Sequence, residues 1–274
     1  MCIRDSDSRE KENDDSLARG LAALGDIYVD DAFAAAHRAH TSVVGIPKYL
    51  PSYAGLNFIN EYNELSEVME PLHPSLFILG GAKFDTKMPL VNKYLDIYDQ
   101  LFVGGAFAND FFKAQGLTVG TSLVSKLDLT DSPLLNHPKI ILPIDVVVEG
   151  PQGKRTTTPD KVADDESILD IGPESIAKLS APILAAKTIL WNGPMGNYEN
   201  GFTDGTTELA KLVAEADAKS LVGGGDTVAA IESLNLADQF SFISTGGGAM
   251  LTFLEHGTLP AIDALNEGKD TAKG

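Results

Sequence analysis

Short apolar runs alternate with amphipathic stretches along most of this chain. The runs are apolar at successive positions rather than at every second one, which is typical of strands buried on both faces. They lie at residues 76–79, 100–103, 140–142, 145–148, 188–191, 220–222 and 241–243. Between them, helical spacing of apolar residues occurs at residues 89–98, 109–115, 173–179, 206–216, 227–234 and 249–255. The alternation predicts an α/β fold with a parallel sheet covered by helices on both faces.

The part of the chain before residue 75 has a different pattern. A short strand is predicted at residues 27–29, and apolar side chains at helical spacing predict a helix over residues 60–70. Pro71 and Pro74 end that helix. We interpret it as a connecting helix between a small first part of the chain and a larger second part.

Glycine clusters follow five of the predicted strands. They are Gly80-Gly81, Gly104-Gly105, Gly223-Gly224-Gly225, Gly246-Gly247-Gly248 and the stretch Trp191-Asn-Gly-Pro-Met-Gly196. The carboxyl ends of parallel strands meet at one edge of a sheet, and glycines there let backbone N–H groups approach a ligand closely. Lys83 and Lys87 follow the first cluster and add two cations. The pattern therefore predicts a nucleotide site along this edge.

Two familiar nucleotide-binding patterns are absent from the sequence. Neither Gly-x-x-x-x-Gly-Lys-Ser/Thr nor Gly-x-Gly-x-x-Gly occurs. The phosphate site is therefore of a less common kind, and a dinucleotide-dependent dehydrogenase is disfavoured.

Charge and composition exclude several classes of function. The formal net charge is −18, which repels nucleic acid and anionic membranes, so we expect neither as a partner. The single cysteine, Cys2, leaves no disulfide within the chain and no cysteine-based metal site. No apolar run reaches the length of a membrane span, and the N-terminus lacks the apolar core of a signal peptide. We therefore expect a cytoplasmic protein.

Several motifs occur in the order in which one known family carries them. They are Gly25-Asp-Ile-Tyr-Val-Asp-Asp-Ala-Phe33 before Ala36-His-Arg-Ala-His40, Gly80-Gly-Ala-Lys83 with Lys87, Gly104-Gly105, Pro143-Ile-Asp145, Asp170-Ile-Gly172, Trp191-Asn-Gly-Pro-Met-Gly196 with Glu199, Gly223-Gly-Gly-Asp-Thr227, and Ser244-Thr-Gly-Gly-Gly-Ala249. Over about residues 17–265 the sequence resembles the phosphoglycerate kinase family. The resemblance implies reversible phosphoryl transfer between 1,3-bisphosphoglycerate and ADP, giving 3-phosphoglycerate and ATP. It implies Mg²⁺ with the nucleotide, a carboxyl group as acceptor and a monomeric enzyme.

The resemblance also implies an organisation into domains. Residues 1–57 would be the remnant of an N-terminal 3-phosphoglycerate-binding α/β domain, and residues 58–73 the connecting helix. Residues 74–274 would form a Rossmann-like three-layer nucleotide domain, with the final segment returning toward the N-terminal domain.

Site residues follow from the same resemblance, motif by motif. Lysines and free backbone N–H groups neutralise the transferred phosphoryl group, a carboxylate holds the metal, and another accepts the ribose hydroxyls. The implied catalytic residues are Lys83, Lys87, Gly246, Gly247 and Gly248. The implied nucleotide-binding residues are Gly80, Gly81, Ala82, Lys87, Gly104, Gly105, Asn192, Pro194, Glu199, Gly224, Gly225, Asp226 and Thr227. His37 and Arg38 would bind 3-phosphoglycerate, and Asp226 would hold Mg²⁺.

The sequence departs from the family at its beginning. The family's early Arg-x-Asp-x-Asn, His-x-x-Arg and Asn/Thr-Arg-Phe segments are missing. We therefore expect a fragment that lacks the first part of the N-terminal domain and transfers phosphoryl groups poorly by itself. The alternative is a catalytically incomplete nucleotide-binding fragment or a pseudoenzyme of the same fold.

Overall fold

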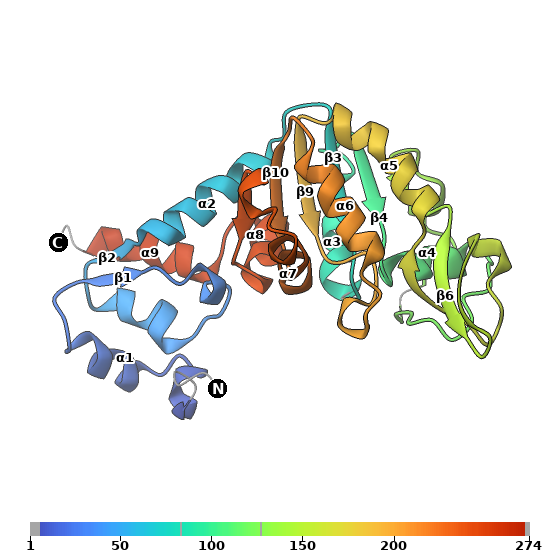
Figure 1. Cartoon of the computed structure of the whole chain (residues 1–274). Coiled ribbons are helices and arrows are strands. Elements are labelled where there is room, and N and C mark those ends of the chain that lie inside the picture. The colour runs from blue at the N-terminus through green and yellow to red at the C-terminus, as the bar shows by residue number, and fades with distance from the viewer. Residues whose placement is uncertain (1–5, 83, 127, 272–274) are drawn as a thin grey trace. The chain divides into compact units, whose positions relative to one another are not determined.

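The computed structural model describes residues 6–82, 84–126 and 128–271. The chain divides into two compact units (Figure 1). One comprises the residues up to 66 together with those from 245 onward, and the other comprises residues 67–244. The predicted boundaries at residues 57/58 and 73/74 stay a prediction. Sequence analysis attaches residues 74–274 to the nucleotide domain and has their final segment return toward the N-terminal domain. In the structure the residues from 245 onward belong to the unit of the first 66 residues.

A six-stranded sheet forms the centre of the unit of residues 67–244, in the order β11-β10-β9-β3-β4-β5. Its strands are β3 (Ser75–Leu79), β4 (Gln100–Val103), β5 (Ile140–Ile141), β9 (Thr188–Asn192), β10 (Lys219–Gly223) and β11 (Phe242–Ser244). All neighbouring strands run parallel, which confirms the predicted α/β fold. Leu79 pairs with both Val103 and Asn192, and Gly223 pairs with both Asn192 and Ser244. The strand ends are therefore level, so that the segments after β3, β4, β9 and β10 leave from one edge.

Helices cover this sheet on both faces, as the apolar strands predict. The helices of this unit are α3 (Phe84–Tyr94), α4 (Phe107–Ala114), α5 (Pro173–Ala185), α6 (Asp204–Ala214) and α7 (Gly225–Ser233). On one face Ile78 and Trp191 pack with residues of α5, α6 and α7 in one buried cluster. On the other face the Phe77 ring meets the rings of Tyr94 and Tyr98 edge-on or tilted. Successive residues of β3 thus point to opposite buried faces.

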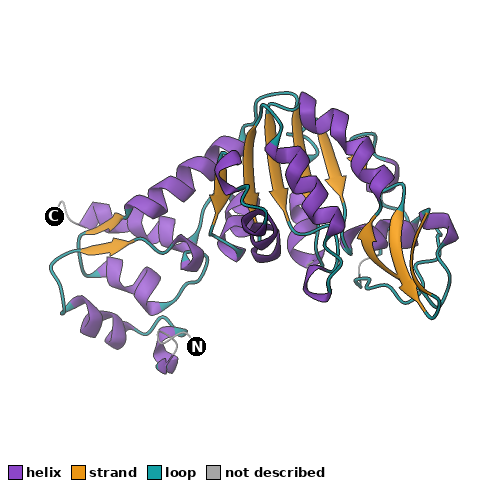
Figure 2. Ribbon diagram, viewed as in Figure 1, coloured by secondary structure: helices purple, strands orange, loops and turns teal. Residues whose placement is uncertain are grey.

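A second, three-stranded sheet stands apart from the first (Figure 2). It is antiparallel and consists of β6 (Val146–Gly150), flanked by β7 (Gly153–Thr157) and β8 (Ser167–Ile171). The prediction that residues 145–148 add a strand to the parallel sheet is wrong. Val146 and Val148 are buried, but they pack against Ala108 and Phe112 of α4 rather than inside the main sheet. A run of valines specifies burial and does not specify which strands will pair with it.

Helix boundaries differ from the predicted ones mainly at prolines. Helix α3 begins at Phe84 and contains Pro89, where the prediction has the helix begin. Helix α5 likewise contains Pro182 and continues to Ala185. The sequence also does not predict α9 (Pro260–Thr271). Short helical turns complete the chain at Ser8–Glu10, Phe33–Ala35, Thr41–Gly45, Ile46–Lys48, Pro133–Asn136, Pro159–Lys161, Tyr198–Asn200 and Ala237–Gln239.

The other unit is built from short elements of both ends of the chain. They are α1 (Asp15–Ala22), the parallel pair β1 (Tyr28–Asp30) and β2 (Ser52–Ala54), the first part of α2 (Leu56–Met69), α8 (Gly248–His256) and α9. The Phe33 ring meets the rings of Phe58 and Phe253 edge-on, and Tyr62 also packs on Phe253. The core of this unit therefore joins residues of both chain ends. The predicted strand at 27–29 and helix at 60–70 are both present, within a few residues.

Candidate nucleotide site

The loops after β3, β4 and β9 cross at very short range. The Gly80 amide donates to Asn192 O at 2.9 Å, and the Gly81 amide donates to Pro194 O at 2.7 Å. A β-carbon on Gly80 would lie 2.3 Å from Pro194 O, and one on Gly105 would lie 2.5 Å from the Gly81 amide nitrogen. Neither approach is possible for a larger residue. At these positions glycine is thus required by the contact between loops, whatever else it does.

The glycines after β10 are in a different situation. No atom lies within 4 Å of where a β-carbon on Gly225 would be. Gly225 begins α7, so its amide belongs to the first turn, where backbone N–H groups have no partner within the helix. Thr227, also in that turn, is fully buried, and its Oγ1 has no hydrogen-bond partner among the described residues. Open space, free donors and a positive helix end together make this turn suited to an anion.

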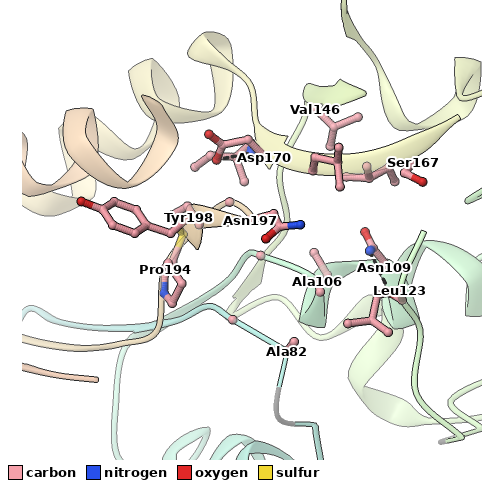
Figure 3. Close-up of a pocket in the computed structure, with 18 of the residues that line it drawn as sticks. Ala82, Ala106, Asn109, Leu123, Val146, Ser167, Asp170, Pro194, Asn197 and Tyr198 are labelled. Carbon is pink, nitrogen blue, oxygen red and sulfur yellow. Dashed lines mark hydrogen bonds between the residues drawn. The ribbon is translucent and has the colours of Figure 1, made fainter. Parts of the chain in front are cut away.

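A cavity of about 490 Å³ lies beside these loops. Figure 3 shows Ala82, Ala106 and Pro194 on one side of it and Val146 and Ser167, from the three-stranded sheet, on the other. The predicted nucleotide-binding residues that line it are Gly81, Ala82, Gly105, Pro194, Glu199 and Asp226. Those that do not line it are Gly80, Lys87, Gly104, Asn192, Gly224, Gly225 and Thr227. Lys83 lies outside the described residues.

Lys87 belongs to the glycine loops and not to solvent. Its side chain extends from α3, is only 3% exposed, and donates from Nζ to Gly80 O. A β-carbon on Gly193 would lie 2.7 Å from the same Nζ. The ammonium group is therefore held between the loop after β3 and the loop after β9, beside the glycine-lined edge.

Two side chains at the end of β9 have structural contacts. Asn192 is buried and donates from Nδ2 to Gly223 O at 3.1 Å, which ties β9 to β10. Trp191 is fully buried and donates from Nε1 to Gly193 O at 2.9 Å, so it is a core residue, as its place at the end of an apolar strand indicates.

Glu199 and Asp226 both line the cavity. Glu199 is exposed and lies in the helical turn Tyr198–Asn200, while Asp226 lies in the first turn of α7. Among the described residues, no three His, Cys, Asp or Glu side chains are grouped so that they could hold a metal ion. Mg²⁺ that accompanies a nucleotide needs only one or two carboxylates beside the phosphate oxygens. Asp226, next to the open turn of α7, fits that kind of metal binding.

Asp170 is a buried carboxyl group at the cavity to which sequence reasoning assigned no role. It is 3% exposed, and its Oδ2 accepts a hydrogen bond from the Gly205 amide at 3.0 Å. Its Oδ1 accepts from the Ile171 amide at 2.9 Å. Burial raises the pKa of Asp170 to about 6, against the lowering effect of these two hydrogen bonds. The signal in the sequence is the motif Asp170-Ile-Gly172, which identifies the segment but not the contact.

The remaining predicted site residues lie in the unit that contains both chain ends. There the structure brings His37 to the beginning of α8, where a β-carbon on Gly248 would lie 3.4 Å from His37 Nε2. Partial burial lowers the pKa of His37, and the charge of Arg38 lowers it further. Arg38 is exposed. Gly247 has open space around it, with no atom within 4 Å of a β-carbon position. Gly246 directly precedes Gly247 and Gly248 in the chain.

Comparison with known proteins decides the family. A family model described as phosphoglycerate kinase matches residues 5–257. The chain belongs to the phosphoglycerate kinase family. It is 46% identical to the phosphoglycerate kinase of Baumannia cicadellinicola over 94% of this chain and 68% of that protein. It is 44% identical to the enzyme of Francisella philomiragia over 94% of this chain and 69% of that protein.

Solved phosphoglycerate kinase structures have the same fold. The structure from Coxiella burnetii matches with a TM-score of 0.84 at 42% identity, over 94% of this chain and 70% of that one. The structure from Pyrococcus horikoshii matches with a TM-score of 0.82 at 28% identity, over 98% of this chain and 71% of that one. The resemblance drawn from the motifs is therefore confirmed. None of the described helices is both long enough and apolar enough to cross a bilayer.

Proposed function

We propose that this phosphoglycerate kinase chain binds Mg²⁺–ADP or Mg²⁺–ATP in the cavity beside the glycine-lined edge. There it would support phosphoryl transfer between 1,3-bisphosphoglycerate and ADP. The observation that carries the proposal is the continuity of the cavity lining, from the apolar wall of β6 and β8 to Asp226 at the open turn of α7. A nucleotide requires apolar surroundings for its base and polar or charged groups for its ribose and phosphates, in that order along the cavity.

The roles of the chain's own residues follow from that placement. The apolar end takes the base, Glu199 accepts hydrogen bonds from the ribose hydroxyls, and the first turn of α7 donates N–H groups to the phosphates. Lys87 supplies a positive charge beside the same loops. Asp226 holds Mg²⁺, which neutralises charge on the phosphate oxygens when it is bound. Lys83 would add a second cation, as the resemblance implies.

The acceptor site is proposed for the unit that contains both chain ends. Arg38 is exposed there, and its guanidinium can hold a phosphate through two hydrogen bonds. His37 lies against the beginning of α8, whose glycines leave backbone N–H groups accessible. We propose that these groups bind 3-phosphoglycerate. A monomeric state and a cytoplasmic location remain predictions, as does the exclusion of nucleic acid and membrane partners, which the net charge of −18 supports.

Lys87→Ala and Glu199→Ala should each weaken the binding of MgADP. Loss of a hydrogen bond to a charged group costs about 1.5–3 kcal/mol, which corresponds to roughly tenfold or more in the dissociation constant. Calorimetric titration of each variant with MgADP measures the effect. Lys178→Ala and Glu232→Ala are matched controls, because both side chains are exposed on helices of the same unit and neither lines the cavity. Unchanged affinity in both test variants would mean that the nucleotide lies elsewhere.

Turnover of 3-phosphoglycerate with MgATP should be detectable in a coupled assay of ADP formation. The assay is run on this chain and on a version extended to the length of the relatives, because sequence analysis predicts slow transfer by the chain alone. Turnover with a different acid acceptor, but none with 3-phosphoglycerate, would contradict the acceptor assignment. MgADP binding without turnover in either version would favour the pseudoenzyme alternative.

A further inference from the structure

Two asparagines of the chain are each followed directly by a glycine, in Asn192-Gly193 and Asn200-Gly201. Such a pair is chemically labile, because a residue without a β-carbon lets its amide nitrogen reach the preceding side chain. The two pairs lie in opposite surroundings. Asn192 ends β9 and is 5% exposed, whereas Asn200 is exposed at the end of the helical turn Tyr198–Asn200.

The fold holds Asn192-Gly193 in place. Asn192 donates from Nδ2 to Gly223 O at 3.1 Å, and it is paired in the parallel sheet with Leu79 on one side and Gly223 on the other. A β-carbon on Gly193 would lie 2.5 Å from Gly80 O, so this backbone is packed tightly against another loop. An attack of the Gly193 nitrogen on the Asn192 side chain would have to displace both the strand and the loop.

Asn200-Gly201 is held much more loosely. The Asn200 amide donates from Nδ2 to the exposed side chain of Asn197 at 3.0 Å, and the Gly201 amide closes the turn by donating to Tyr198 O at 3.1 Å. Within 4 Å of a β-carbon position on Gly201 there is no atom of the described residues. Exposed hydrogen bonds of this kind contribute little net free energy, so a surface turn of three residues opens readily.

We propose that Asn200 deamidates through the Gly201 amide, and that the product weakens nucleotide binding at the adjacent Glu199. The Gly201 nitrogen attacks Cγ of Asn200, so that a bond between these atoms forms and the bond from Cγ to Nδ2 breaks. The proton of the Gly201 nitrogen leaves with Nδ2 as ammonia, and a succinimide ring remains. Water then opens the ring at either carbonyl and yields aspartate or isoaspartate, in which the backbone runs through the side chain. Water is the co-reactant, and no oxidant or reductant takes part.

Either product alters the turn that carries Glu199. Glu199 directly precedes Asn200, and both Glu199 and Asn197 line the nucleotide cavity. The neutral amide becomes a carboxylate, which repels the Glu199 carboxylate and the phosphates of a nucleotide. Isoaspartate also adds a methylene group to the backbone, which displaces so short a turn. The effect on binding rests on the proposed function, whereas the deamidation does not.

The reaction is measured on the unaltered chain by mass spectrometry. The chain is kept at mildly alkaline pH and digested with trypsin at intervals. Asn192 and Asn200 lie on one tryptic peptide, residues 188–211, because no lysine or arginine occurs between Lys187 and Lys211. Each conversion adds about 1 Da, and fragmentation assigns it to one of the asparagines. Asn200 should convert at least about tenfold faster than Asn192, since only its turn opens without unfolding the sheet.

The same incubation in urea is the control for the local sequence. Unfolding removes the protection of Asn192, so both asparagines should then convert at similar rates. The ratio in the folded chain therefore measures the effect of the structure and not that of the following glycine. Slow conversion of both asparagines in the folded chain, with fast conversion of both in urea, would overturn the proposal.

The incubated chain should bind MgADP more weakly as Asn200 is converted. Calorimetric titration should show a fraction of chains, equal to the converted fraction, with a dissociation constant raised roughly threefold or more. Asn200→Gln is the matched control, because glutamine keeps the amide group but places it one methylene further from the Gly201 nitrogen. That variant should keep its initial affinity through the same incubation. Unchanged affinity in a converted chain would overturn the effect on binding.

Failure of this inference differs from failure of the proposed function. If the fresh chain binds ADP and Glu199→Ala weakens it, but conversion of Asn200 makes no difference, only the inference is wrong. If the fresh chain does not bind ADP, or binds it without regard to Glu199, the proposed function is wrong, and the effect on binding fails with it.

Discussion

Gly105→Ala should destabilise the unit of residues 67–244 by about 3 kcal/mol or more, whereas Gly225→Ala should change its stability by less than about 0.5 kcal/mol. Gly105 has a φ of +60°, and its β-carbon would lie 2.5 Å from the Gly81 nitrogen and 2.8 Å from Pro194 O. A positive φ costs a residue with a β-carbon about 1–2 kcal/mol, and forcing apart the two packed backbones costs about 1–3 kcal/mol more. Gly225 has neither problem.

Urea unfolding followed by tryptophan fluorescence tests this pair. Trp191 is the only tryptophan of the chain and is fully buried in the unit of residues 67–244, so its emission reports the unfolding of that unit. Gly225→Ala should nevertheless weaken MgADP binding, because its methyl group would occupy the space beside the first turn of α7. Equal losses of stability in the two variants would contradict the distinction between glycines that let loops cross and glycines that face a ligand.

The sequence predicts the parallel sheet and the glycine-lined edge because both follow from local patterns. A continuous apolar run such as Ser75–Leu79 indicates a strand buried on both faces, and in-register parallel strands bring the following glycines together. The three-stranded sheet could not be predicted in the same way. Strand β7 is exposed along almost its whole length, and its sequence, Gly-Lys-Arg-Thr-Thr, has no apolar pattern. Its existence depends on pairing with β6, which a local pattern does not contain.

The sequence names candidate residues where the residue type itself indicates the chemistry, as with Glu199, which lines the cavity, and Lys87, which is held beside it. Asp170 could not be identified in this way, because it is distinguished only by its burial and by its hydrogen bonds to two backbone amides. The sequence also did not distinguish two kinds of glycine. Gly225 has open space around it, whereas Gly80 and Gly105 are required by the crossing loops.

Asp170→Asn should become stabilising relative to the unaltered chain as the pH rises from about 4 to about 7. Burial raises the pKa of Asp170 to about 6 in the folded chain, against an ordinary value of 3.8 for an aspartate side chain. Between these values the folded chain holds a proton that the unfolded chain has lost, so the free energy of unfolding falls with rising pH. The loss is complete above pH 6. A difference of about two pKa units corresponds to about 3 kcal/mol, and the side chain is too buried for solvent screening to reduce it greatly.

Asparagine avoids this loss because it never ionises, and it keeps one oxygen as an acceptor for the Gly205 or the Ile171 amide. The charged groups that influence Asp170 are Asp204, which raises its pKa, and Lys154, which lowers it.

Urea unfolding by Trp191 fluorescence at pH 4, 5, 6 and 7 gives the stability difference between variant and unaltered chain. Taking the difference cancels the other carboxylates, many of which titrate in the opposite sense. Asp238→Asn is the control, because that side chain is exposed in the same unit and is not among the charged groups that influence Asp170, so the variant should give only a small difference. A difference for Asp170→Asn that stays constant over this range would show that the carboxyl group is ionised at all these pH values, and hence that the folded chain does not raise its pKa.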